Sequence, residues 1–225
     1  MQTTVNIRPN ADHLDAMRLA MIDSQLRPNA VSDPRVIAAM ASVARELFLD
    51  ESLAAVAYAD VKLPLTPGRV MNLPVATGRL LTAAALRETD KVLLIGAAGG
   101  YTAAVLARLV ASVVAVECDA DLVRAARHAL AAAPNVTVVE GLLAAGHPAA
   151  APYDVIVVDG AIDQLPQALV DQLGVEGRLV TGLIDRGVCR LSVGHRTAGG
   201  FGLADFADFD AAGLPGFTPE KGFVF

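Results

Sequence analysis

The sequence contains no tryptophan, and aromatic residues make up only 4% of its 225 residues. Hydrophobic residues nevertheless reach 54%, so the interior must be built mainly from Ala, Val and Leu. No apolar run approaches the roughly 20 residues that a helix needs to span a bilayer. Residues 1–20 carry polar and charged side chains throughout, without the apolar stretch of a secretory signal. These absences predict a cytoplasmic protein with no membrane partner.

Lysine is also scarce, with Lys62, Lys91 and Lys221 as the only three. The net charge of −6 and the scattered arginines argue against a nucleic-acid partner, since phosphate binding requires clustered cations. Cys118 and Cys189 lie in apolar stretches without a CxxC motif, which favours buried free thiols over a redox pair. The histidines share no ligand-like spacing with cysteines or carboxylates, so no metal site is predicted.

The length fits a single domain spanning residues 1–225. Residues 12–57 have the apolar spacing of helices, with Ser32 or Asp33 as a predicted N-cap. They contain too few apolar residues for a core of their own, so we expect a helical layer on a larger unit.

Residues 58–78 contain three prolines and two glycines and predict a long ordered loop. Such loops are often functional, and the alternative is a covering flap without ligand contact.

Strands alternate with helices from residue 91 onwards. The runs KVLLIGA, SVVAVECD, VTVVEG, YDVIVVDG and GRLVTGLI are apolar and rich in β-branched residues. Strands of this kind indicate a parallel sheet covered on both faces. The alternation therefore predicts an α/β fold with a doubly wound, mostly parallel, Rossmann-like sheet over residues 82–187. In residues 188–225, VCRLSVGHR predicts an antiparallel edge strand, and the Phe-rich end is expected to dock on the sheet.

The stretch IGAAGGYT joins the first of these strands to a helix. Ligands of doubly wound sheets bind at such a turn, beyond the carboxyl ends of the strands. A dinucleotide fingerprint that starts at Gly96 requires glycine at positions 98 and 101, where this chain has Ala98 and Tyr101. A pyrophosphate is therefore disfavoured at this turn.

Glu117 ends the next strand, roughly 20 residues beyond the first glycine, which is the spacing of a ribose-binding acid. A carboxylate there is placed to accept both ribose hydroxyls of an adenosine. The alternative is that Glu117 and Asp119 only cap the following helix, although Asp119 suffices for that. An adenosine cofactor without a pyrophosphate is favoured, and S-adenosylmethionine is the leading candidate.

Several longer stretches occur in an order typical of one enzyme family. They are DSQLRPNAVSDPRVIAAMASVARELFL, AYADVKLPLTPGRVMNLP, VLLIGAAGGYTAAVLARL, PNVTVVEG and APYDVIVVDGAIDQLPQALVDQL. In order and spacing, residues 15–185 resemble protein-L-isoaspartate (D-aspartate) O-methyltransferases. The resemblance implies a class I methyltransferase fold and S-adenosylmethionine as cofactor. It also implies a partner, namely proteins or peptides containing isoaspartyl residues, whose free α-carboxylate accepts the methyl group.

The resemblance also implies which residues form the site. Asn72 stands where the family has a Ser that positions the substrate, and its amide can still donate two hydrogen bonds. Ala98 adds a methyl group where the cofactor approaches the turn, and Leu142 replaces an Asp that faces the adenine. The implied cofactor-binding residues are Gly96, Ala98, Gly100, Glu117, Cys118 and Leu142.

Asp159 ends the fourth strand, where the family usually carries Thr or a small residue. An acid at this position can act as a base or bind a cation for a different acceptor, and it repels an anionic one. The alternative is a helix cap or a solvated turn acid. Three functions stay open: an isoaspartyl carboxyl methyltransferase, a methyltransferase with a different acceptor, and a non-catalytic binding protein with the methyltransferase fold.

Overall fold

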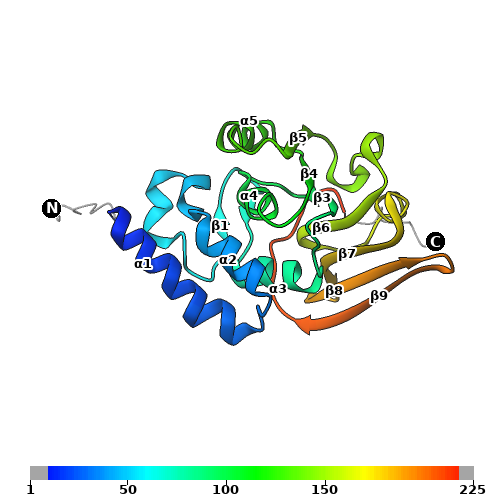
Figure 1. The fold of residues 1–225 in the computed structure, drawn as a ribbon, viewed down its shortest axis with the longest axis horizontal. Helices are drawn as coiled ribbons and strands as arrows, with labels where there is room; N and C mark the ends of the chain where they lie inside the picture. The colour runs from blue at the N-terminus through cyan, green and yellow to red at the C-terminus, as the bar shows by residue number, and fades with distance from the viewer. Residues whose placement is uncertain (1–9, 218–225) are drawn as a thin grey trace, which may run out of the picture.

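The computed structural model describes residues 10–217, which form a seven-stranded sheet flanked by helices (Figure 1). The strand order is β5-β4-β3-β6-β7-β8-β9; the first five pair in parallel and the last two in antiparallel fashion. The predicted α/β fold with a mostly parallel sheet is confirmed. The strands are β3 (Lys91–Ile95), β4 (Ser112–Glu117), β5 (Val136–Glu140), β6 (Tyr153–Ile162), β7 (Leu173–Asp185), β8 (Val188–Thr197) and β9 (Gly200–Asp208).

The two faces of the sheet are covered by different elements. In β3, Val92 and Leu94 pack into a core shared with α3 (Pro74–Ala83), α4 (Tyr101–Leu106) and α5 (Ala120–Ala129). Leu93 and Ile95 point the other way, into a core with α6 (Gln167–Val170). Because successive side chains of a strand alternate between the faces, burial on both faces explains the continuous apolar runs in the sequence.

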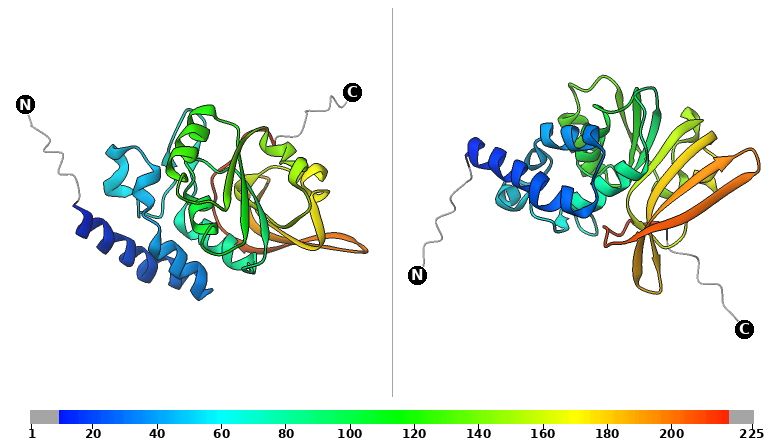
Figure 2. Two further views of the ribbon diagram at one scale, coloured as in Figure 1. Left: turned by 45° about the horizontal axis from the view of Figure 1, so that its top comes forward. Right: turned by 60° about the horizontal axis from the view of Figure 1, so that its bottom comes forward.

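The N-terminal residues form a helical layer beside the sheet (Figure 2). Helix α1 (Ala11–Met21) continues through a π turn, and α2 (Pro34–Ser42) begins after Asp33, whose side chain accepts a hydrogen bond from the Arg35 amide. Two 3₁₀ turns, Arg45–Phe48 and Glu51–Val56, complete the layer. Met40 and Leu26 are fully buried in the same core as α3, so the layer shares the interior of the sheet domain.

The predicted loop at residues 58–78 is shorter than expected. It contains a small antiparallel pair, β1 (Leu63–Pro64) and β2 (Val70–Met71), and helix α3 already begins at Pro74. Proline is favoured at the first helical position because its fixed φ suits a helix and its missing N–H costs nothing there. The proline that counted as a loop signal in the sequence is therefore a helix start.

The C-terminal part also differs from the prediction. β8 pairs antiparallel as predicted, but it is not the edge strand, because the chain folds back after Thr197 and adds β9 outside it. After β9, Ala211, Ala212 and Leu214 are buried against the sheet, and Phe217 is only 4% exposed. Phe223 and Phe225, also counted in the Phe-rich tail, lie outside the described residues.

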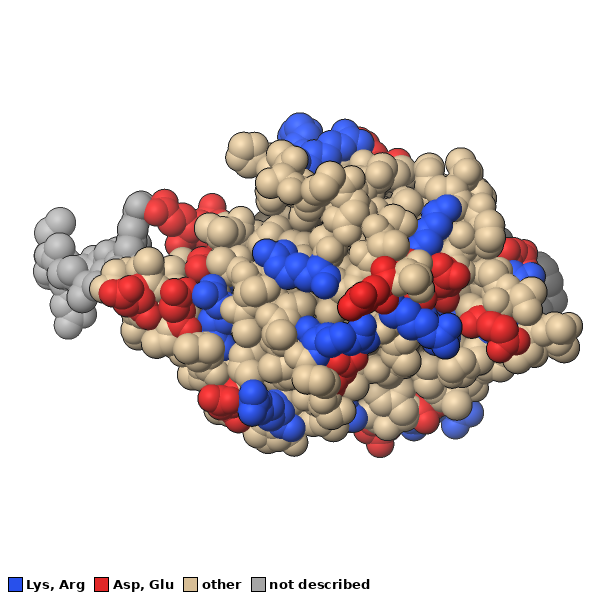
Figure 3. Space-filling model, viewed as in Figure 1, with Lys and Arg blue, Asp and Glu red and all other residues tan. Residues whose placement is uncertain are grey.

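Within residues 10–217, no helix is both long and apolar enough to cross a membrane. On the face seen in Figure 3, acidic and basic side chains are intermingled and form no broad field of one sign. The distribution of charge on this face therefore matches the scattered arginines of the sequence.

Candidate functional site

The glycine turn lies between the end of β3 and the start of α4. Gly96, Ala98 and Gly100 all have positive φ, at 80°, 49° and 103°. This left-handed conformation is natural for glycine but costs other residues roughly 1–2 kcal/mol. The strain at Ala98 is accompanied by a hydrogen bond, because its amide donates to Glu117 Oε2 at 2.7 Å. The turn is therefore fastened to the neighbouring strand β4.

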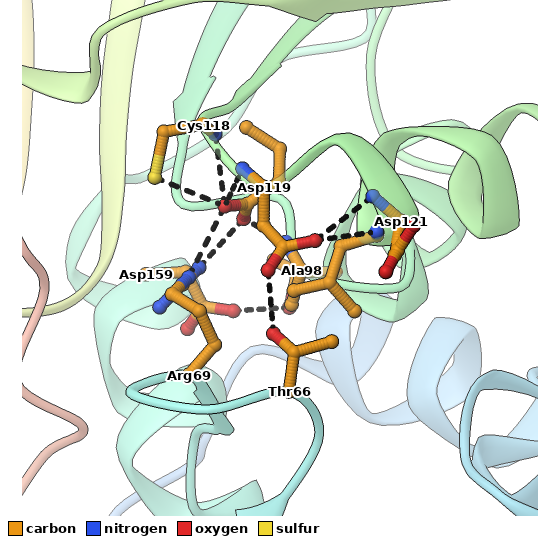
Figure 4. A network of polar contacts seen from close by, with 10 residues as sticks. Thr66, Arg69, Ala98, Cys118, Asp119, Asp121 and Asp159 are labelled. Carbon is orange, nitrogen blue, oxygen red and sulfur yellow. Dashed lines mark hydrogen bonds and ion pairs between the residues drawn. The ribbon is translucent and has the colours of Figure 1, made fainter.

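Glu117 is fully buried at the end of β4 and is paired with an arginine from the loop before α3 (Figure 4). Arg69 Nε lies 3.1 Å from Oε1 and Nη2 lies 2.6 Å from Oε2, which is a bidentate ion pair. Arg69 itself is 4% exposed. Burial opposes ionisation of Glu117, but the hydrogen bonds and charge of Arg69 together with the amides of Ala98 and Cys118 outweigh it, so the pKa of Glu117 is lowered.

Asp119, and not Glu117, caps the helix that follows. Its Oδ1 accepts from the amides of Asp121 and Leu122 at 2.9 and 3.0 Å, at the first turn of α5. Its Oδ2 accepts from Thr66 Oγ1 at 2.7 Å, and this hydrogen bond is the main reason why the pKa of Asp119 is lowered. The capping alternative for Glu117 is therefore excluded in this structure.

Asn72 and Asp159 lie in direct contact. Asn72 Nδ2 donates to Asp159 Oδ1 at 2.9 Å, although 87 residues separate them in the chain. Thr77 Oγ1 donates to the same oxygen at 2.8 Å, and Thr102 Oγ1 donates to Oδ2 at 2.5 Å. Asp159 is 9% exposed and lies inside β6. The alternative of a helix cap or a solvated turn acid is therefore wrong for Asp159.

The hydrogen bonds of Asp159 bear on its possible chemistry. Both carboxylate oxygens accept from neutral donors, two at Oδ1 and one at Oδ2, so the acid holds Asn72, Thr77 and Thr102 in place. Within residues 10–217 no three His, Cys, Asp or Glu side chains come together as a metal-binding group. Asp159 therefore fits a positioning role for Asn72 better than a role as a base or a cation ligand.

The carbonyl oxygen of the Asn72 amide is also engaged. Oδ1 accepts from the amide of Leu73 at 3.0 Å and from the amide of Ala212 at 2.9 Å. The amide nitrogen carries two hydrogens and one goes to Asp159, so the second has no hydrogen-bond partner among the described residues, and Asn72 is only 3% exposed. Asn72 is thus held in one orientation by the loop, by β6 and by the C-terminal segment.

Arg45 is a buried cation beside this pair, and the sequence patterns did not single it out. It is fully buried, donates from Nε to the carbonyl of Ala57 at 2.8 Å and from Nη2 to the carbonyl of Asn72 at 2.5 Å. Its guanidinium lies 4.8 Å from the centre of the Tyr101 ring. Burial lowers the pKa of Arg45, while Tyr101 and Asp159 act in the opposite direction. The only hint of its burial in the sequence is its position between Val43 and Leu47, two apolar residues of a predicted helix face.

Two of the expected cofactor residues, Leu142 and Cys118, are exposed. Leu142 is 76% exposed, and its place beside the adenine stays a prediction. The thiol of Cys118 is exposed, and Cys189 is only partly buried, so the prediction of two buried thiols is wrong. Cys118 follows the last residue of β4 directly, and its thiol lies 3.5 Å from Oε1 of Glu117.

The backbone of this site is arranged as an adenosine requires, but one of the side chains that would bind it is already occupied. The strand-end acid and the glycine turn are placed as an adenosine requires. However, the carboxylate that a ribose needs is already paired with Arg69. The residues fit the cofactor only when Arg69 is not bound to Glu117.

The sequence matches one enzyme family over most of its length. The sequence model of a family described as Protein-L-isoaspartate(D-aspartate) O-methyltransferase matches residues 17–200. A Protein-L-isoaspartate O-methyltransferase from Methanoculleus marisnigri is 42% identical over 172 residues, which is 76% of this chain and 78% of that protein. One of the same name from Methylorubrum populi is 43% identical over 169 residues, covering 74% of this chain and 79% of that protein.

Solved structures agree on the fold. A structure titled protein-L-isoaspartate O-methyltransferase has a TM-score of 0.77 at 24% identity, with 88% of this chain and 66% of that one covered. A putative enzyme of this kind from Plasmodium falciparum, in complex with S-adenosyl-L-homocysteine, has a TM-score of 0.73 at 17% identity, with 88% and 97% covered. From the extent of the family match and the identity to these relatives, the chain belongs to the protein-L-isoaspartate(D-aspartate) O-methyltransferase family.

Proposed function

We propose that this chain is an S-adenosylmethionine-dependent carboxyl O-methyltransferase that acts on L-isoaspartyl residues of damaged proteins. The observation that carries the proposal is the family match over residues 17–200, which includes both the glycine turn and the loop with Asn72. Its partners are then proteins or peptides that contain isoaspartyl residues.

The chemistry of the acceptor suits the side chains of the site. Bound S-adenosylmethionine supplies an electrophilic methyl group. The acceptor α-carboxylate is ionised at neutral pH, because its reference pKa is about 3.5, so no strong base is required. The residues then have to orient the carboxylate, and orientation alone supplies a large part of such catalysis. Asn72 orients the acceptor through its second amide hydrogen, Glu117 holds the cofactor's ribose, and the turn at residues 96–100 lies beside it.

The charges near Asn72 permit an anionic acceptor. Asp159 alone would repel a carboxylate, but Arg45 is buried beside it and interacts with it electrostatically. The positive charge of Arg45 therefore acts against the repulsion between Asp159 and an anionic acceptor. This opposing charge supports isoaspartate as the substrate despite the acid in β6.

Transfer of a labelled methyl group from S-adenosylmethionine tests the proposal. We expect incorporation into a peptide with one isoaspartyl residue and none into the same peptide with a normal aspartyl residue. Absence of transfer to the isoaspartyl peptide at saturating cofactor would overturn the proposed activity. Asn72→Ser restores the side chain typical of the family, and we expect it to raise the rate of transfer.

A second candidate is a methyltransferase with a different acceptor. It is favoured by the hydrogen bonds of Asn72, which leave a single donor for the substrate. Binding of S-adenosylhomocysteine without transfer to the isoaspartyl peptide would favour this candidate. Absence of both binding and transfer would favour a non-catalytic protein.

A further inference from the structure

Arg69 is carried by a tight turn between β1 and β2. Residues 66–69 form this turn, with the Arg69 amide donating to the carbonyl of Thr66 at 2.9 Å. Pro67 occupies the second position and Gly68, at φ 79°, the third, as in a type II turn. Each flanking strand has only two residues. The geometry of the turn therefore directs the Arg69 side chain towards the end of β4.

Two side-chain contacts fasten the turn to the sheet, and both reach the junction of β4 and α5 (Figure 4). One is the bidentate pair of Arg69 with Glu117, and the other is the hydrogen bond from Thr66 to Asp119 at 2.7 Å. A pair of two-residue strands has little stability of its own. The strands that flank the turn are anchored by the buried side chains of Leu63 and Met71, whereas the turn itself is held to the sheet by these two side-chain contacts.

The carboxylate of Glu117 has no acceptor capacity left. A carboxylate offers about four lone-pair sites. Oε1 accepts from Arg69 Nε and from the amides of Cys118 and Asp119 at 3.1, 2.9 and 3.2 Å. Oε2 accepts from Arg69 Nη2 and the amide of Ala98 at 2.6 and 2.7 Å. Ribose hydroxyls can therefore donate to Glu117 only after Arg69 has left.

We infer that Arg69 competes with the ribose of the cofactor for Glu117, so that the cofactor binds only the form in which the turn at residues 66–69 has moved away. The inference rests on the proposed function, because it takes the cofactor to be an adenosine. Arg69 is then a determinant of cofactor affinity that is separate from the acceptor site at Asn72.

The turn has both room and energetic freedom to move. A Cβ placed on Gly68 meets no atom within 4 Å, so the outer side of the turn faces open space. A buried ion pair contributes little net stability, since the cost of removing both charges from water offsets most of their attraction. Arg69 Nη1 is also buried without a hydrogen-bond partner, which reduces the stability of the closed form further.

Competition of this kind lowers the apparent affinity for the cofactor. When only a fraction of the molecules is in the open form, the apparent Kd rises in inverse proportion to that fraction. Removal of the Arg69 charge breaks the bidentate pair and so weakens the closed form without touching the carboxylate. The variant should therefore bind the cofactor more tightly than the natural chain does.

Titration calorimetry with S-adenosylhomocysteine tests this on the full chain. We expect Arg69→Gln to lower the Kd at least about tenfold relative to the natural chain. The matched control is Arg178→Gln, which breaks the other buried arginine–carboxylate pair, with Asp90, at the opposite end of the sheet. With folding checked by circular dichroism, the control should keep the Kd of the natural chain within about twofold. If the Kd of Arg69→Gln is within about twofold of the natural chain's Kd, or higher, the inference is overturned.

Two milder variants give the test a second line of evidence should Arg69→Gln not fold. Arg69→Lys loses the bidentate geometry and Thr66→Val loses the second anchor, so each should lower the Kd by about two- to fivefold. Unchanged affinity in both would overturn the inference. Methyl transfer to the isoaspartyl peptide is measured on the same samples. If the variants bind S-adenosylhomocysteine more tightly but transfer no methyl group, the inference is supported and the proposed function is overturned. If methyl transfer occurs but the variants and the natural chain have the same Kd, the proposed function is supported and the inference is overturned. Absence of binding in every variant overturns both.

Discussion

Two buried arginine–carboxylate pairs lie at opposite ends of the same sheet. Arg178 Nη2 lies 2.5 Å from Asp90 Oδ2 at the amino ends of the strands, with side chains 7% and 5% exposed. Arg69 Nη2 lies 2.6 Å from Glu117 Oε2 at the carboxyl ends, with side chains 4% and 0% exposed. Each arginine also leaves one buried nitrogen without a hydrogen-bond partner. Distance and burial therefore do not distinguish the two pairs, although two nitrogens of Arg69 and only one of Arg178 bind the carboxylate.

The pairs differ in what carries the arginine. Arg178 belongs to β7, a strand held by β6 and β8 on either side, and Asp90 directly precedes β3 and also accepts from the Arg87 amide at 2.8 Å. Arg69 belongs to a turn with two-residue strands. The same chemical pair thus joins two elements of the sheet at one end, and joins a short turn to the sheet at the other. The element, more than the contact, decides whether an ion pair is structural or part of a ligand site.

The largest effect on stability is expected for Arg178→Gln. The carboxylate of Asp90 would stay buried with the Arg87 amide as its remaining donor, so the free energy of unfolding should fall by about 3–5 kcal/mol. Urea denaturation followed by circular dichroism measures this. If Arg178→Gln lowers the free energy of unfolding no more than Arg69→Gln does, the structural role of the Arg178–Asp90 pair is contradicted.

The next largest effect is expected at the carboxyl end, for Asp159→Ala. Without the acid, Asn72, Thr77 and Thr102 lose their common acceptor, and Asn72 no longer keeps its orientation. We expect kcat/KM for the isoaspartyl peptide to fall about 10²-fold, mainly through kcat. Asp159→Asn keeps an acceptor and should recover part of the rate. Equal rates for Asp159→Ala and the natural chain would show that the acid is incidental.

A smaller effect concerns acid stability and Arg69. Because the pKa of Glu117 is lowered in the folded state, its ionisation stabilises the fold above the unfolded pKa of about 4.3, and this contribution is lost as the pH falls through the lower folded pKa. In Arg69→Gln the folded pKa rises towards the unfolded one. The midpoint of acid unfolding should therefore move to higher pH, by up to about one unit. A midpoint at the same or lower pH would contradict the pairing.

The smallest effect is expected for Ala98→Gly. Glycine relieves the left-handed backbone strain but increases the entropy of the unfolded chain, so the free energy of unfolding should change by less than about 1 kcal/mol. Ala97→Gly is the matched control, since Ala97 has no positive φ and is buried, and it should destabilise the fold by more. Thermal unfolding of the two variants side by side measures the difference. A larger loss for Ala98→Gly would mean that the turn is not strained.

The sequence predicted the sheet because its strands are apolar on both faces, and this signal does not depend on tertiary context. It also predicted the turn and the acid at the end of β4, since both follow from spacing along one strand–helix–strand unit. It did not predict the partner of that acid. Arg69 and Glu117 are 48 residues apart, and nothing local to Arg69 marks it as buried. The edge strand was misplaced for a related reason, because the pairing of β9 is a contact between strands and not a property of either.

The contact between Asn72 and Ala212 has a consequence for biosynthesis. It joins residues that are 140 positions apart, and one of them lies in the last segment that the structure describes. A nascent chain therefore completes its sheet core, from β3 to β7, well before Asn72 acquires the amide that fixes it. A chain that ends before Ala211 would keep the glycine turn but lack this contact. The acceptor side of the site is thus assembled only after the last strand of the sheet, β9, has been synthesised.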